Sequence, residues 1–69
     1  MVDMKTVESS NVAKVGYKDS VLYIEFNSGA LYTYSAVPEK VYNDLMEAES
    51  IGKFLNQQIK GTYNYERIK

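Results

Sequence analysis

The chain has no cysteine and no histidine among its 69 residues. Without cysteine there is no disulfide, and without either residue type there is no ordinary zinc site, so we expect no metal and no cofactor. The same absence removes the usual nucleophile–base pairs of covalent catalysis, and no glycine loop of the phosphate-cradling kind is present. The sequence therefore predicts a protein that is not an enzyme.

Long hydrophobic runs are also missing. No apolar stretch approaches the ~20 residues that a membrane helix needs, and the opening MVDMKTVESS is too polar for a signal peptide. We expect a cytoplasmic protein without a membrane partner. The length suits one small domain, predicted over residues 11–69 after a flexible N-terminal arm over residues 1–10. Residues 6–8 of this arm are candidates for pairing at a sheet edge.

The charge is small overall and unevenly distributed. A net charge of −1 argues against an indiscriminate binder of nucleic acid. Residues 1–49 hold four lysines against eight acids, a net −4. Residues 50–69 are basic, with a net +3 from Lys53, Lys60, Arg67 and Lys69 against Glu66. This C-terminal segment is the electrostatic pointer in the sequence.

The first half of the chain predicts a three-stranded antiparallel meander, with strands over about 12–18, 21–26 and 30–35, from its β-branched and aromatic residues and its apolar alternation. A two-residue turn is expected at Asp19-Ser20, and a three-residue loop, Asn27-Ser28-Gly29, with Gly29 in the left-handed conformation. This register gathers the apolar residues on one face: Ala13, Val15, Tyr17, Leu22, Ile24, Phe26, Ala30, Tyr32 and Tyr34. A one-residue slip would turn both Tyr32 and Tyr34 to the other face.

The second half predicts two short helices packed on one face of the sheet, which makes the fold α+β. The first helix, over about 38–48, begins with Pro38 as its first residue. Ser50 is the expected N-cap of the second helix, over about 51–60, and Gly61 its left-handed C-terminal cap. Residues 62–67 alternate again and are a candidate short strand.

The tyrosines and the basic residues are the candidates for binding. Tyr32 and Tyr34 are expected in the core under the preferred register. Tyr63 and Tyr65 lie in the basic segment, where aromatic rings can stack on bases while cations contact phosphate. The predicted nucleic-acid-binding residues are Lys53, Lys60, Tyr63, Tyr65 and Arg67.

Two other surfaces compete with this interpretation. The start of the second helix, with Ser50, Gly52 and Lys53, is a candidate site for an anion such as phosphate or a nucleotide, or simply an ordinary cap. The open face of the sheet, with Tyr23 and Leu31, is a candidate for docking a protein or a second copy of the chain as a homodimer.

Several short motifs, in this order and spacing, resemble the KTSC domain family over about residues 7–68: Val12-Ala13-Lys14-Val15-Gly16-Tyr17, Leu31-Tyr32-Thr33-Tyr34, Val37-Pro38, Ser50-Ile51-Gly52, Phe54-Leu55-Asn56 and Tyr63-Asn64-Tyr65. The family occurs at the C-terminus of certain lysyl-tRNA synthetases and as free-standing bacterial and phage proteins. The resemblance implies a small α+β module of unassigned function, with RNA binding suggested by the synthetase fusion. Its central Tyr-x-Tyr motif falls on Tyr32 and Tyr34, which, with Pro38, we expect to be structural.

We therefore predict a non-catalytic binding module whose partner is RNA or another nucleic acid, bound through the basic C-terminal segment. The alternatives are a protein-interaction or phage accessory module and a module for a small phosphate ligand.

Overall fold

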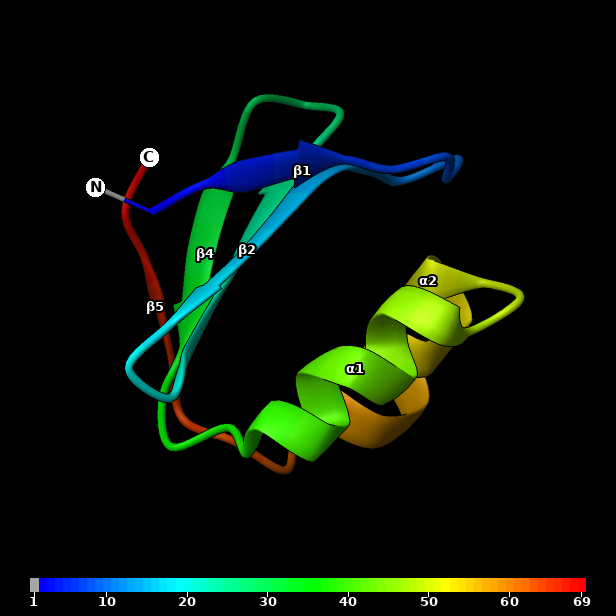
Figure 1. Ribbon diagram of the computed structural model, residues 1–69. Helices are drawn as coiled ribbons and strands as arrows, with labels where there is room; N and C mark the ends of the chain where they lie inside the picture. The colour runs from blue at the N-terminus through cyan, green and yellow to red at the C-terminus, as the bar shows by residue number, and fades with distance from the viewer. Residues whose placement is uncertain (1) are drawn as a thin grey trace.

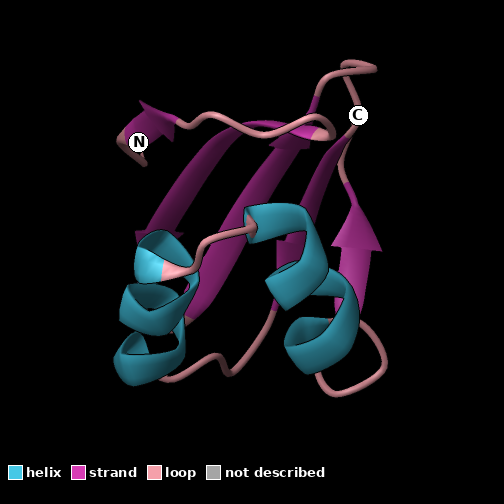
Figure 2. Ribbon diagram, turned by 90° about the vertical axis from the view of Figure 1, so that its right-hand side faces the viewer, coloured by secondary structure: helices cyan, strands magenta, loops and turns pink. Residues whose placement is uncertain are grey.

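A computed structural model describes residues 2–69, which form a five-stranded antiparallel sheet with helices on one face (Figure 1). The strands are β1 (Met4–Thr6), β2 (Val12–Lys18), β3 (Val21–Phe26), β4 (Leu31–Tyr34) and β5 (Tyr65–Arg67). They lie side by side in chain order. The connection from β4 to β5 holds α1 (Glu39–Glu47), α2 (Ile51–Phe54) and the π-helical turn η1 (Leu55–Ile59), which cover the same face (Figure 2). The α+β prediction is confirmed, with β1 added to the sheet and the candidate C-terminal strand present as β5.

The predicted register of the central strands is confirmed. Leu22 lies opposite Tyr34 and Ile24 opposite Tyr32. Both turns lie where they were predicted: Asp19 and Ser20 take positive φ values of 52° and 66°, and Gly29 takes the expected positive φ, 95°. Because a two-residue hairpin turn of this hand matches the twist of the strands, it fixes which residues face each other. Tyr32 and Tyr34 therefore face the helices.

The start of β2 departs from the prediction. Val12 lies opposite Phe26 and Lys14 opposite Glu25, so Ala13 is an extra residue in a β-bulge. A bulge shifts the alternation of side chains by one residue. Consequently Val12, rather than the predicted Ala13, is fully buried beside Val15.

The N-terminal segment contributes an edge strand. The pairing runs from Met4 opposite Gly16 to Thr6 opposite Lys14, earlier in the chain than the predicted residues 6–8, and one further hydrogen bond joins the Val7 N–H to the Ala13 carbonyl. Gly16 is crowded by this strand, because a Cβ there would overlap the Met4 Sδ and lie 2.7 Å from the Val2 Cγ1 and 3.2 Å from the Asp3 carbonyl oxygen. The flexibility predicted for residues 1–10 stays a prediction.

The helices agree with the sequence in position but not in every detail. Pro38 lies just before α1, in extended conformation, rather than as its first residue. Ser50 caps α2 as predicted, its Oγ accepting a hydrogen bond from the Lys53 N–H at 3.3 Å. Gly61 has the expected positive φ, 82°.

The second helix ends in a π-helical turn, closed by a hydrogen bond from the Lys60 N–H to the Leu55 carbonyl at 2.8 Å. In an α-helix a turn holds 3.6 residues, so each side chain four residues further on lies slightly past the previous one around the helix axis. A π-turn holds more residues, so it displaces side chains four apart in the opposite direction around the axis. As a result Ile51, Leu55 and Ile59 all reach the core.

The core lies between the sheet and the helices. Its buried residues are Val12, Val15, Leu22, Ile24, Tyr34, Val37, Leu45, Ile51, Leu55 and Ile59. Tyr17 of β2 contacts both α1 and the segment before it. Its ring stacks on Tyr42 of α1 with centroids 4.9 Å apart, and its hydroxyl donates to the carbonyl of Val37, just before α1, at 2.5 Å. Within residues 2–69, no helix is long and apolar enough to cross a membrane.

Candidate functional site

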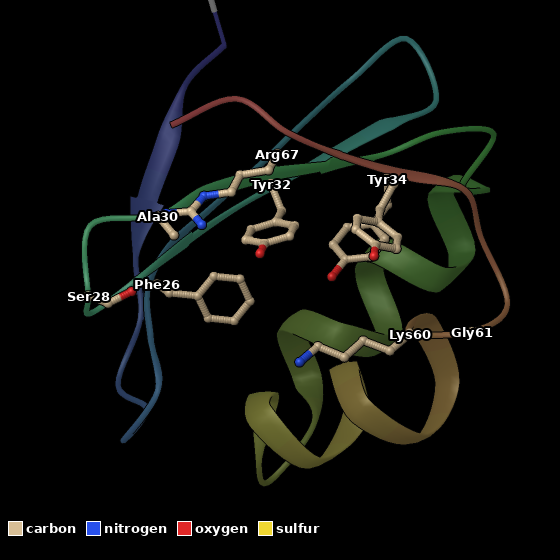
Figure 3. A pocket seen from close by; sticks show the side chains of 9 residues that line it. Phe26, Ser28, Ala30, Tyr32, Tyr34, Lys60, Gly61 and Arg67 are labelled. Carbon is tan, nitrogen blue, oxygen red and sulfur yellow. The ribbon is translucent and has the colours of Figure 1, made fainter.

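The helices leave one side of the sheet face uncovered, and a cavity of about 600 Å³ lies there, between the sheet and the end of η1 (Figure 3). This volume falls within the range typical of ligand sites. Aromatic and basic side chains dominate the lining, which consists of Phe26, Ser28, Ala30, Tyr32, Tyr34, Lys60, Gly61, Tyr65 and Arg67. We call this space the aromatic cavity.

The strand register assembles the aromatic wall of this cavity. β5 places Tyr65 opposite Tyr34 and Arg67 opposite Tyr32. Residues that lie opposite each other project on the same face of a sheet. The Tyr65 ring lies 5.8 Å from that of Tyr32 and 6.1 Å from that of Tyr34, and Phe26 meets Tyr32 edge to face at 5.5 Å. Four rings from three strands thus form one contiguous surface.

The wall runs from a buried end to an exposed end. Tyr34 is only 2% exposed, whereas Tyr65 is 65% exposed. Burial, with smaller contributions from Tyr32 and Tyr65, raises the pKa of the Tyr34 phenol above its ordinary 10.0. The phenol is therefore neutral at physiological pH. Exposed aromatic surface of this kind is what a planar ligand can stack on.

Two cations flank the rings. The Lys60 ammonium lies 5.6 Å from the centroid of the Phe26 ring, and the Arg67 Nε donates to the Lys69 carbonyl at 3.0 Å. Tyr32 and Tyr34 extend from the sheet toward the side of the cavity where Lys60 lies (Figure 3). Among the described residues, no carboxylate lines the cavity. The salt bridge within residues 2–69 joins Lys40 to Asp44, which do not line it. Both cations can therefore serve an incoming anion.

The structure brings together three of the five residues predicted to bind nucleic acid. Lys60, Tyr65 and Arg67 line the aromatic cavity, but Lys53 and Tyr63 do not. Lys53 is exposed on α2, and Tyr63 is half-buried against the core. The five residues thus do not form a single cluster, because the turn after η1 directs Tyr63 inward before β5 begins. Contact of Lys53 or Tyr63 with a ligand stays a prediction.

Three aromatic lining residues were missed as binding candidates. Tyr32 and Tyr34 were predicted to be structural, and Phe26 was predicted only to lie on the apolar face of the sheet. Tyr34 is buried as predicted, whereas Tyr32 and Phe26 are half-buried. The available signal was the register itself, since it places all three on the face to which β5 then adds Tyr65.

The competing surfaces are less open than predicted. At the start of α2, the Ser50 hydroxyl already accepts the Lys53 N–H, which favours the ordinary cap. Tyr23 and Leu31 lie on the opposite face of the sheet as expected, but both are half-buried.

Fold and cavity together define a small α+β domain with a helix-covered antiparallel meander and an aromatic, basic cavity at one side. The chain belongs to the KTSC domain family, whose model matches residues 8–63. The crystal structure of a KTSC domain protein from Yersinia pestis has the same fold, with a TM-score of 0.94, 32% identity and full coverage of both chains. The family resemblance of the motifs is thus confirmed.

Relatives include free-standing and fused domains. The chain is 45% identical over 65 residues to an uncharacterized protein of Stutzerimonas stutzeri, covering 90% of this chain and 92% of that protein. It is 40% identical over 63 residues to a lysine–tRNA ligase of Nostoc punctiforme, covering 88% of this chain but 11% of the ligase.

Proposed function

We propose that this domain is a non-catalytic module that binds single-stranded nucleic acid, RNA foremost, in the aromatic cavity. The observation that carries the proposal is the set of rings between Lys60 and Arg67, with no carboxylate from the described residues in the lining. A base is a flat ring and a nucleotide carries an anion. The cavity offers a partner for each.

Magnitudes favour a single strand over a duplex. Stacking of a base on an aromatic side chain contributes ~1–3 kcal/mol in single-strand binders. In double-stranded RNA the bases are stacked on one another and so are not free to enter such a cavity. Two cations contact few phosphates, so the affinity is modest and depends on salt.

The relatives add support for RNA. A lysine–tRNA ligase carries a region similar to this chain, and a fused module that binds RNA suits an enzyme of that name. A cytoplasmic location is part of the same proposal. We do not include catalysis in the proposal. Within residues 2–69, no group of three or more acids, histidines or cysteines could hold a metal ion, and no carboxylate of these residues lines the cavity to act as a base.

The test is an NMR titration of labelled protein with a short single-stranded RNA at low salt, repeated at higher salt. We expect chemical-shift changes at Tyr32, Lys60, Tyr65 and Arg67 that fade as salt rises. No change at low salt, or changes centred on Tyr23 across the sheet, would overturn the proposal.

Matched variants sharpen this test. Tyr65→Ala removes a ring that is 65% exposed, so the fold is retained while stacking is lost. We expect RNA affinity to fall about fivefold or more, from the lower end of the stacking energy. Tyr23→Ala, a tyrosine removed from the opposite face of the sheet, is the control and leaves the affinity unchanged.

A further inference from the structure

A second cavity of about 320 Å³ adjoins the aromatic cavity. The two share three lining residues, Phe26, Ser28 and Lys60. Because Lys60 lies over the Phe26 ring, this pair marks the boundary between them. We call the two adjoining cavities together the groove, and Lys60 lies at the boundary between them.

The second cavity differs in chemistry from the first. Its lining includes the amide side chains of Asn11, Asn27 and Asn56. The Asn27 amide nitrogen donates to the Ser9 and Ser10 carbonyls, at 3.4 and 2.9 Å. This holds the side chain in place, while its oxygen accepts no hydrogen bond from any residue in 2–69. Asn11 and Asn56 are exposed. Amide groups both donate and accept, which is the pattern that the edges of unpaired bases require.

We propose that the two cavities are adjacent subsites for two consecutive nucleotides of a single strand. One base stacks in the aromatic cavity, the next presents its edge to the amides of the second cavity, and the phosphate that links them lies at Lys60. The position of this cation places the linking phosphate between the two subsites, since a linking phosphate is the one anion that two neighbouring nucleotides share. The proposal rests on the nucleic-acid function proposed above and makes the dinucleotide the unit of recognition.

The test compares ApA, a ribodinucleotide with one linking phosphate, with AMP, by calorimetry and NMR on the whole chain. We expect ApA to bind about tenfold more tightly, because the second base adds hydrogen bonds to the amides, although AMP carries more charge. ApA should shift resonances of both Tyr65 and Asn56, and AMP those of Tyr65 alone.

Two variants on the same helical turn assign the second subsite. Asn56→Ala removes one of the three amides, so it should reduce the affinity for ApA by about two- to tenfold and leave AMP binding unchanged. Gln57→Ala is the matched control, since Gln57 is an exposed amide on the same turn that lines neither cavity. Both changes introduce the best helix former, so the fold is retained.

The outcomes separate the two proposals. Equal affinity for ApA and AMP, with shifts confined to the aromatic cavity, overturns the second subsite but leaves nucleic-acid binding intact. Equal effects of Asn56→Ala and Gln57→Ala overturn it as well. Failure of ApA, AMP and a longer single strand alike to bind at low salt overturns the function on which it rests.

Discussion

The salt dependence of RNA binding gives a quantitative prediction for the groove. Lys60 and Arg67 line the aromatic cavity, whereas Lys53, seven residues before Lys60 on the same helical segment, does not. The variants Lys60→Gln and Arg67→Gln therefore each remove one phosphate contact. Lys53→Gln removes the same unit of charge from the molecule but no contact in the groove, which makes it a matched control.

Counterion release sets the expected magnitude. For single strands the slope of log K against log salt concentration is about −0.7 for each phosphate neutralised, so two contacts give about −1.4 and each single variant about −0.7. Between 50 and 200 mM salt, affinity of the unaltered protein should fall about sevenfold and that of Lys60→Gln or Arg67→Gln about threefold. Lys53→Gln should keep the steeper slope.

Fluorescence anisotropy of a labelled single-stranded RNA across a salt series measures these slopes directly. Loss of the interaction between Lys60 and the Phe26 ring costs only about 0.5–1 kcal/mol at an exposed site, and a urea titration of each variant verifies that the fold survives. If Lys53→Gln lowers the slope as much as Lys60→Gln, the protein responds to overall charge, and the placement of phosphate in the groove is wrong.

Three further predictions concern the fold. Gly16→Ala places a Cβ against the Met4 Sδ and 2.7 Å from the Val2 Cγ1, and it should destabilise the protein by about 1 kcal/mol in urea denaturation. Met4→Ala in the same chain should restore part of this, and strictly additive effects would contradict the clash with Met4. Ser20→Gly should raise stability by up to about 1 kcal/mol, since φ is 66° there and glycine removes the left-handed strain; an unchanged or lower thermal midpoint would count against it. The pKa of Tyr34 is raised above 10.0 by burial, so in alkaline solution the folded state keeps a proton that the unfolded state releases. The stability from this group is therefore complete below the unfolded pKa and is lost as pH rises through the folded pKa. In urea titrations over a pH series, Tyr34→Phe should lose this part of the decline, and identical pH profiles of the two proteins would refute it.

The sequence by itself determined the central meander and the ends of the second helix, because the signals there are local. The turn residues Asp19 and Ser20, and the loop ending in Gly29, set the register between neighbouring strands. Alternating apolar residues then decide which face is buried. Ser50 acts on a backbone group only three residues away. Each of these features depends on a few adjacent residues and needs no knowledge of the rest of the chain.

The tertiary structure alone decided the bulge at Ala13, the π-turn η1 and the groove. The first two arise because Val12 and Ile59 must reach a core that other elements have already shaped. The groove depends on β5, a three-residue strand too short to specify its own partner. It pairs where β4 leaves an open edge, and this brings Tyr65 beside Tyr32 and Tyr34, more than thirty residues earlier in the chain. A contact at that separation follows from the packing of the whole domain, so periodicity along the chain could name the tyrosines but not bring them together.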